Sequence, residues 1–331
     1  MRLLSEADVL SLLEPKALIN ASAAAYRAIA GGSTVMPLRT EFIRPEIDGV
    51  IFVMPGMIGE RLFGLKVIAN RADGDGGLTT TALVLLLDAQ SLSVLGLVAA
   101  DLLTDYRTAA GLAAAVDVLA PADIRTHVIY GAGKLAGPSA LLIQEVRQAS
   151  TLLLVGRNRD RVERLADTLR AHARFAGVEI RADLGADEAA AAADLVTCVT
   201  SATLPVFDGR RLADGTHVTV AGAFHKGARE IDDAVARRAR FFTDSMSACL
   251  QRSGDIVQPL EAGVIHREQV EAEIGAVLAG QYAFDREPGD VTVFKSLGTA
   301  AQDLVTAEQL LEAAEAAGRG ISFALDPTPA G

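Results

Sequence analysis

Residues 127–136, HVIYGAGKLA, constrain the fold of this chain more than any other segment. An apolar stretch typical of a buried strand is followed by Gly131, Gly133 and Ala136 and then by a helix-forming segment. In such a turn the first glycine permits the tight bend, the second lets the backbone approach a ligand, and a small third residue keeps the helix close to the sheet. The free N–H groups and the dipole at the helix N-terminus favour a bound pyrophosphate. The motif therefore predicts a dinucleotide-binding Rossmann unit; the alternative is a glycine turn without a ligand.

Short apolar segments alternate with helix-like segments from residue 126 onward. The expected strands are His127–Tyr130, Thr151–Val155, Val178–Arg181, Leu195–Val199 and His217–Ala221. The expected helices between them are Lys134–Arg147, Arg159–Ala176 and Asp187–Ala193. Strand–helix alternation is typical of βαβ units and of a parallel sheet. We therefore predict an α/β fold in which residues 120–298 form a doubly wound Rossmann domain.

The residues before this domain contain strand-like segments with no long helix between them. Ser5 and Asp8 form a capping signal for a first helix, and Pro15 suits the first turn of a second helix that ends at Gly31. The strands expected next are Val35–Arg44, Val50–Met54, Leu62–Ala69, Ala82–Asp88 and Val94–Ala100. Two more helices are expected, over Leu102–Leu119 and from Gly298 to about Gly318. Residues 1–119 are therefore expected to form an α+β domain with its own sheet.

Composition excludes several classes of partner. The net charge of −11 argues against a nucleic-acid partner, because phosphate binding needs a basic surface. The longest apolar runs are far shorter than the ~20 residues of a membrane span, and the N-terminus lacks the apolar region of a signal peptide. Cys198 and Cys249 are expected to be free, buried thiols in a reducing, cytoplasmic compartment, with a catalytic cysteine as the alternative. No metal site is predicted.

The end of the second Rossmann strand bears on the choice of cofactor. An acidic residue there would hold the ribose hydroxyls of NAD, but this chain has Arg157, Asn158 and Arg159 instead. An arginine fork at this place matches the 2′-phosphate of NADP. The alternative is an arginine that stacks on the adenine, which would serve NAD equally well. The sequence therefore favours NADP over NAD.

Four basic residues stand out as candidate substrate ligands: Arg39, Lys66, Arg107 and Lys295. Lys66 lies within an otherwise apolar strand, where a cation is costly unless it is paired. Its side chain should face away from Leu65 and Val67, on the face that carries Gly64, where the missing side chain would leave room for a ligand. Taken singly, each cation could be a surface ion-pair partner. Two or more that converge on a carboxylate would form a site for an amino or keto acid.

These residues lie in motifs that resemble the ornithine cyclodeaminase/mu-crystallin family over nearly the whole chain. The motifs are MPLR at 36–39, GLK at 64–66, LTxxRTAA at 103–110, GAGxxA at 131–136, TSAT at 200–203, AGA at 221–223, REID at 229–232, FTDS at 242–245 and FKSLGTAxQD at 294–303. The resemblance implies a Rossmann domain inserted into an α+β substrate-binding and dimerisation domain made of residues 1–119 and 299–331. It also implies a homodimer.

The resemblance further implies the roles of individual residues. Arg39, Lys66 and Arg107 would hold the substrate carboxylate. The residues expected to contact the cofactor are Arg107, Thr108, Gly131, Ala132, Gly133, Lys134, Leu135, Arg157, Asn158, Arg159, Thr200, Ser201, Gly222, Ser296 and Gly298.

One residue departs from the pattern of the ornithine cyclodeaminases. Those enzymes place an aspartate soon after the fifth Rossmann strand, where it holds the amine and transfers protons, whereas this chain has Phe224. The nearby His225 and Lys226 are expected to be surface residues, with catalysis as the alternative. Ornithine cyclodeamination is therefore not expected.

The resulting hypothesis is an NAD(P)H-dependent oxidoreductase. It would act on a small imino acid, ketimine or amino acid, with Lys66 as proton donor. The alternatives are an ammonia-releasing cyclodeaminase that retains NAD, and a non-catalytic NADPH-binding protein of mu-crystallin type that sequesters a ligand.

Overall fold

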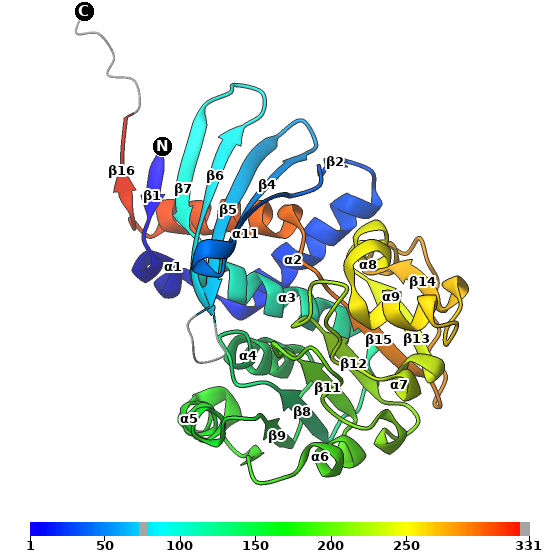
Figure 1. Ribbon diagram of the computed structural model, residues 1–331. Helices are drawn as coiled ribbons and strands as arrows, with labels where there is room; N and C mark the ends of the chain where they lie inside the picture. The colour runs from blue at the N-terminus through cyan, green and yellow to red at the C-terminus, as the bar shows by residue number, and fades with distance from the viewer. Residues whose placement is uncertain (73–77, 325–331) are drawn as a thin grey trace, which may run out of the picture. The chain divides into compact units, whose positions relative to one another are not determined.

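The computed structural model describes residues 1–72 and 78–324, and the chain divides into two compact units (Figure 1). The first unit comprises Met1–Arg107 and Thr299–Gly331, and the second comprises Thr108–Gly298. The sequence-based boundary between residues 119 and 120 coincides with the C-terminal end of helix α3 (Asp101–Leu119). The structural boundary instead lies inside α3, which belongs to both units.

The first unit is built on one mixed sheet with the strand order β16-β1-β7-β6-β5-β4-β2, in which β3 pairs with β4. Its strands are β1 (Arg2–Leu4), β2 (Thr34–Val35), β3 (Thr40–Arg44), β4 (Gly49–Ile58), β5 (Leu62–Ala72), β6 (Leu78–Asp88), β7 (Val94–Ala99) and β16 (Ile321–Ser322). The single strand predicted over Val35–Arg44 is wrong. The chain leaves the sheet between β2 and β3, where Pro37 has no N–H to donate.

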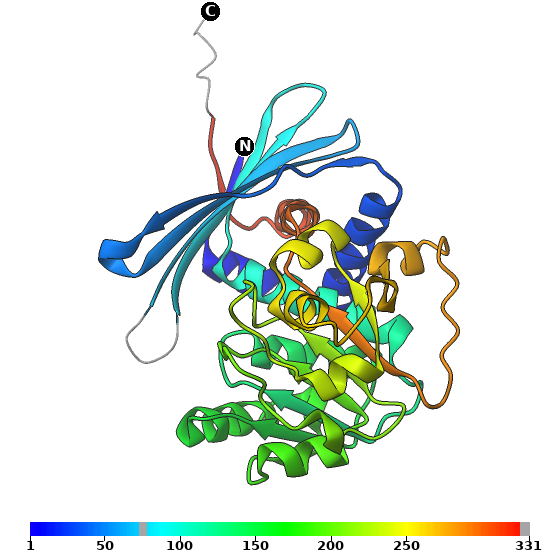
Figure 2. The same cartoon turned by 45° about the vertical axis from the view of Figure 1, so that its right-hand side comes forward.

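Helices cover one face of this sheet. They are α1 (Glu6–Leu12), α2 (Pro15–Ala30) and α11 (Ala300–Ala316), together with the start of α3. The short 3₁₀ helix Pro45–Ile47 connects β3 to β4 and has no buried residue. The predicted capping box of Ser5 and Asp8 is confirmed, as is the start of α2 at Pro15. Helix α11 is seen almost end-on in Figure 2, beneath the sheet. Buried residues of β4 to β7 form one apolar cluster with Leu304, Ala307 and Leu311 of this helix.

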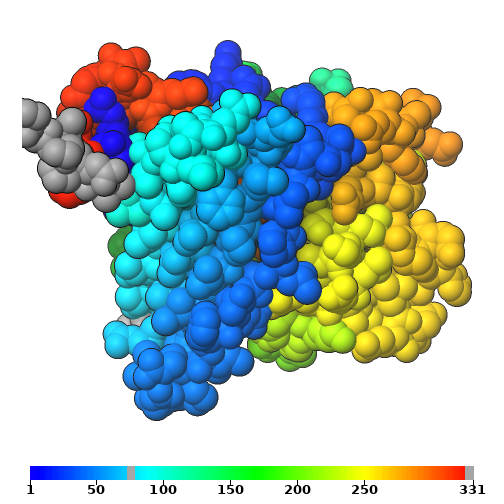
Figure 3. Space-filling view, turned by 90° about the horizontal axis from the view of Figure 1, so that it is seen from above, coloured from blue at the N-terminus to red at the C-terminus, as the bar shows by residue number. Residues whose placement is uncertain are grey.

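Part of the same sheet is exposed. All five residues of β3 are exposed, and Figure 3 shows this blue part of the chain at the molecular surface. Large apolar side chains are among them, since Phe42 is 53% and Ile43 is 68% exposed. An exposed apolar strand of this kind is a candidate contact surface.

The second unit is a parallel sheet with the strand order β10-β9-β8-β11-β12-β15-β13-β14, which confirms the predicted α/β fold. Its strands are β8 (Thr126–Tyr130), β9 (Thr151–Val155), β10 (Glu179–Arg181), β11 (Leu195–Cys198), β12 (His217–Val220), β13 (Ala239–Thr243), β14 (Val270–Glu273) and β15 (Val291–Lys295). The last three of these strands were not predicted.

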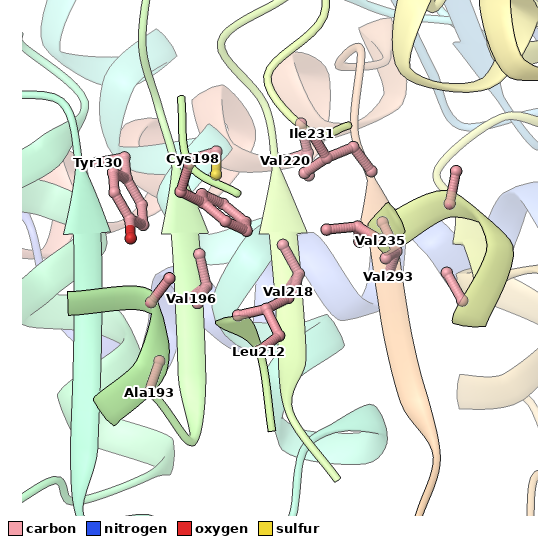
Figure 4. Close-up of a cluster of buried hydrophobic side chains, with 14 of the residues drawn as sticks. Tyr130, Ala193, Val196, Cys198, Leu212, Val218, Val220, Ile231, Val235 and Val293 are labelled. Carbon is pink, nitrogen blue, oxygen red and sulfur yellow. The ribbon is translucent and has the colours of Figure 1, made fainter. Parts of the chain in front are cut away.

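The α-helices of this unit are α4 (Ala136–Val146), α5 (Arg159–Arg170), α6 (Ala186–Ala192), α7 (Asp233–Arg238), α8 (Met246–Arg252), α9 (Gly254–Glu261) and α10 (Ile274–Leu278). The helix predicted over Arg159–Ala176 stops earlier, because residues 173–175 form a separate 3₁₀ turn. Figure 4 shows the core that the sheet builds, with Tyr130, Val196, Val218 and Val293 on four neighbouring strands. Both cysteines are free and buried, as predicted. None of the helices within the described residues is long and apolar enough to cross a membrane.

Candidate functional site

A buried ion cluster lies in the first unit, on the covered face of the sheet. Lys66 is on β5, whose even-numbered residues from Leu62 to Ile68 are buried, and its side chain is 1% exposed. Its Nζ donates a hydrogen bond of 2.8 Å to Oδ1 of Asp303, which lies in the first turn of α11 and is 0% exposed. The predicted orientation of Lys66, away from Leu65 and Val67, is therefore confirmed.

Arg107 joins the same carboxylate. Its Nε lies 2.8 Å from Oδ1 of Asp303, but its N–H is not aligned for a hydrogen bond, so the contact is an ion pair. Nη1 of Arg107 donates to the side chain of Gln302 at 3.4 Å, and the Gln302 amide donates to the Arg107 carbonyl at 3.3 Å. Oδ2 of Asp303 has no hydrogen-bond partner among the described residues. Two cations thus contact Oδ1 of one buried carboxylate, and Oδ2 of the same carboxylate accepts no hydrogen bond from the described residues.

The environment tunes the acidity of Lys66. The pKa of Lys66 is lowered to about 8, first by burial and then by the charges of Arg107 and Arg39, while Asp303 opposes the shift. A lysine with a pKa near neutral pH can both hold and release a proton under ordinary conditions. This property distinguishes Lys66 from the permanently charged arginines beside it.

Arg39 has different contacts from those of the other two cations. It precedes β3, forms an ion pair of 3.2 Å with Glu41, and lies over the ring of Phe52 at 4.5 Å. The prediction that Gly64 leaves room for a ligand is wrong. A Cβ at Gly64 would lie 2.7 Å from a methyl group of Leu304 and 2.5 Å from the carbonyl oxygen of Leu85. The glycine is needed for close packing of α11 on the sheet.

The glycine-rich turn of the second unit has the form that a dinucleotide needs. Gly131 has a φ of 117°, and a Cβ there would lie 2.5 Å from the carbonyl oxygen of Val199. A Cβ at Gly133, by contrast, would meet nothing within 4 Å, so the backbone is open to a ligand at that point. No side chain caps the N-terminus of α4 at Leu135, but the N–H of Ala136 donates to the carbonyl oxygen of Gly133 at 3.1 Å and Pro138 has no N–H, so only part of the first turn of α4 could donate to an anion. These features fit the pyrophosphate of a nicotinamide dinucleotide.

The residues predicted to select the cofactor follow β9. Arg157 is exposed directly after the strand. Asn158 is the N-cap of α5 and accepts a hydrogen bond of 3.0 Å from the N–H of Arg161. Arg159 pairs with Glu163 at 3.3 Å across one turn of the exposed helix surface. Both arginines are exposed, but only Arg159 has an ion-pair partner among the described residues.

The two loops after β11 and β12 meet at a buried carboxylate. Oε1 of Glu230 accepts hydrogen bonds of 2.7 Å from the N–H and from the hydroxyl of Thr200. Oε2 accepts from the N–H groups of Gly222 and Ala223 at 2.7 and 3.0 Å. Burial raises the pKa of Glu230, while the charge of Lys295 and the donors from Thr200 oppose the rise.

Lys295 serves a different purpose from that of a substrate ligand. It is 0% exposed at the end of β15, and its Nζ donates to Oδ2 of Asp255 at 2.8 Å and to the carbonyl oxygen of Ala223. Burial lowers the pKa of Lys295, but the charges of Asp255 and Glu230 outweigh this effect and raise it. Lys295 therefore stabilises the loop after β12 through its bonds to Ala223 and Asp255.

Ser296 and Gly298 are held by another buried acid. Oδ2 of Asp244 accepts hydrogen bonds from the Ser296 hydroxyl, the Leu297 N–H and the Gly298 N–H, at 2.8, 2.7 and 2.6 Å. The segment after β15 is thus fixed by a residue that the sequence analysis did not select as functional.

Phe224 lies in the loop after β12, at the position where the resemblance to the cyclodeaminases predicts an acid. The side chain is 37% exposed, with the ring of His225 at 5.7 Å in an edge-on arrangement. His225 and Lys226 are both exposed, in agreement with the expected surface positions. A phenyl ring can neither accept a proton nor bind an ammonium group as a carboxylate does.

Known proteins resemble this chain over nearly its whole length. The sequence model of the ornithine cyclodeaminase/mu-crystallin family matches residues 1–318. This chain belongs to that family.

Among its relatives is a Delta(1)-pyrroline-2-carboxylate reductase of Bacillus cereus, which is 29% identical over 322 residues, covering 94% of this chain and 98% of the reductase. The ketimine reductase mu-crystallin of Mus musculus is 29% identical over 301 residues, which cover 90% of each chain. A solved structure of the Thermococcus litoralis Delta(1)-pyrroline-2-carboxylate reductase with NADH and L-proline superposes with a TM-score of 0.91 at 29% identity, covering 98% of this chain and 100% of that one.

Asp303 is the site residue that sequence reasoning missed although a signal was present. It lies on the same stripe of α11 as Ala307, Leu310 and Ala314, all of which are buried. An acid on the apolar stripe of an amphipathic helix needs a cationic partner, and Lys66 was the matching buried cation.

Proposed function

We propose that this chain is an NAD(P)H-dependent reductase of small cyclic imines or ketimines that carry a carboxylate. The observation that supports it most strongly is Lys66, a buried lysine with a pKa of about 8 beside two cationic side chains. Reductases of such imines are among the relatives of this chain. The open Gly133 turn supplies the matching cofactor site.

Reduction of the C=N bond requires one hydride at carbon and one proton at nitrogen. A nicotinamide cofactor bound at the glycine-rich turn would supply hydride for the imine carbon. As the electron pair of the C=N bond moves onto nitrogen, Lys66 Nζ gives up the proton that the nitrogen takes, and becomes neutral. Arg107 and Arg39, which are permanently charged, hold the substrate carboxylate. Asp303, through its contacts with Lys66 and Arg107, positions both donors.

The direct test is steady-state oxidation of NADPH and NADH, followed by absorbance, with Delta(1)-pyrroline-2-carboxylate as substrate. Turnover with a carboxylated cyclic imine, and its loss with the decarboxylated ring, is the expected result. Tight cofactor binding without turnover of any cyclic imine would favour a ligand-sequestering protein instead.

Ornithine is expected not to be converted to proline and ammonia at a useful rate. Phe224 offers no carboxylate to hold the second amine or to transfer its proton. Incubation of the protein with NAD and ornithine, with proline and ammonia assayed separately, checks this. Robust release of ammonia would mean that another residue supplies the proton transfer, and would revive the cyclodeaminase alternative.

Arg157 is expected to give NADPH an advantage over NADH by contacting the 2′-phosphate. Loss of a charge-assisted contact costs about 1.5–3 kcal/mol, so Arg157→Ala should weaken NADPH binding about tenfold or more. NADH binding should change little. The chain has no tryptophan, so the fluorescence of the reduced cofactor can be titrated directly. Arg164→Ala, which removes an arginine from the following helix, is the control. Equal losses for both cofactors would contradict the 2′-phosphate role.

A homodimer in the cytoplasm completes the proposal. The exposed apolar residues around β3, Val35, Leu38, Phe42, Ile43 and Ile47, are 50–74% exposed, and a second copy of the chain would remove them from water. The two free thiols suit a reducing compartment. Sedimentation analysis tests the dimer.

A further inference from the structure

The REID segment contributes a side chain that the proposed reaction does not use. Glu230 lies outside the helices and strands and is fully buried. Its two carboxylate oxygens accept hydrogen bonds from three backbone N–H groups of the loops and from one hydroxyl. Both loops follow neighbouring parallel strands, since β11 pairs with β12. Ligands of doubly wound sheets bind outside the carboxyl ends of such strands.

The loops that Glu230 joins are in contact with each other and with the glycine-rich turn. A Cβ on Gly222 would lie 2.0 Å from the carbonyl oxygen of Thr200. A Cβ on Gly131 would lie 2.5 Å from the carbonyl oxygen of Val199 and 3.4 Å from the Thr200 side chain. The segments after β8, β11 and β12 are therefore in contact with one another, and Glu230 accepts hydrogen bonds from the last two.

Glu230 is itself held in place by charges. Oδ1 of Asp255 accepts hydrogen bonds from the N–H groups of Glu230 and Ile231, at 2.6 and 3.2 Å. Oδ2 of Asp255 binds Lys295, whose Nζ returns to the loop at the carbonyl oxygen of Ala223. The side chains of Glu230, Asp255 and Lys295 therefore form one connected network, and all three are 0% exposed.

We propose that Glu230 is a positioning residue that fixes the loops after β11 and β12 in the form that receives the nicotinamide cofactor before the cofactor arrives. Asp255 accepts a hydrogen bond from the N–H of Glu230 and Lys295 binds Asp255, so these two residues keep Glu230 in position. Hydrogen bonds to a charged acceptor are stronger than neutral ones, and a surface that is ordered in advance loses less entropy when a ligand binds. The inference rests on the proposed function, because it takes the ligand to be NADH or NADPH.

The first test is hydrogen–deuterium exchange of the wild-type protein without cofactor. The peptides that cover residues 199–203 and 221–224 should already be protected at the amides of Thr200, Gly222 and Ala223. Addition of NADH should protect the turn at 131–135 and change these three amides little. Exchange at the rate of open loops in the cofactor-free protein would overturn the proposal, whatever the variants show.

The second test is Glu230→Gln. One end of the introduced amide is an NH₂ group that cannot accept, so one pair of buried donors loses its acceptor. We expect the Kd for NADH, measured by cofactor fluorescence, to rise about 10–100-fold. Exchange should increase in the two loop peptides and stay unchanged elsewhere. Thr200→Val, a milder change, removes one donor to Glu230 and should raise the Kd about 2–10-fold.

Glu271→Gln is the matched control. Glu271 is a partly buried carboxylate of the same unit that binds Arg240 and the hydroxyl of Tyr282. Its loss should lower thermal stability without changing the Kd for NADH. If Glu230→Gln and Thr200→Val bind NADH as the wild type does, the positioning role is wrong. If the wild type binds neither NADH nor NADPH, the proposed function fails instead.

Discussion

Replacing Lys66 with methionine is expected to lower kcat by about 10²–10⁴-fold, the usual contribution of a general acid. Methionine fills a similar volume but cannot supply a proton to the substrate nitrogen. The affinity for NADPH should stay near normal, because the glycine-rich turn is in the other unit of the chain. Single-turnover reduction of a cyclic imine, followed by the absorbance of NADPH, measures the chemical step.

A second substitution separates proton donation from charge. Lys66→Arg keeps a cation beside Asp303 but offers a guanidinium that does not release its proton at accessible pH. A proton donor predicts that both variants lose kcat. A plain carboxylate clamp predicts that both mainly raise KM, with the arginine variant less affected, because a clamp acts in the ground state and the transition state alike. Lys16→Met, which alters an exposed lysine of α2, is the matched control.

The parts of the fold that could be predicted are those with a short-range signal. The strand–turn–helix at residues 126–146 and the strand Thr151–Val155 follow from local apolar runs and glycines. Strands β13, β14 and β15 are as long as the predicted strands β8, β9, β11 and β12, and β15 follows the turn residues Pro288 and Gly289, so at least β15 had a local signal that was missed. Their place in the sheet is set by neighbours distant in sequence.

The candidate site divides in the same way. Lys66 was selected because a cation in an apolar strand stands out in the sequence, and Asp303 could have been selected as its partner on α11. No pattern in the sequence indicates that Glu230 accepts from Thr200 and Gly222, because an acid in a loop is usually solvated. Such contacts depend on the crossing of loops after the strands have paired.

Asp303→Asn is expected to change the pH dependence of the reaction as well as the stability of the protein. In the wild type, kcat/KM for imine reduction should fall as pH rises through about 8, because the protonated form of Lys66 is the donor and its pKa is about 8. Asp303 raises that pKa against the effects of burial and of Arg107. Without this charge the pKa falls, so the alkaline limb should move to lower pH.

The stability effect has the same origin. Asp303 is the counter-charge of two buried cations, and removal of one partner from a buried ion cluster typically costs 3–5 kcal/mol. Asparagine retains an oxygen for Lys66 but no charge. Denaturant unfolding of Asp303→Asn at neutral pH should show a loss of about this size. Glu308→Gln, on the same helix, breaks an ion pair with the largely exposed Arg61 and should cost about 1 kcal/mol or less.

The two measurements together decide the role of Asp303. A merely structural residue would lower the free energy of unfolding and the amount of active protein, but the alkaline limb of kcat/KM would stay at the same pH. A shift of that limb in Asp303→Asn, absent in Glu308→Gln, would show that the carboxylate sets the acidity of Lys66. If the alkaline limb of kcat/KM does not shift, the titrating group is not Lys66, and another residue or solvent donates the proton.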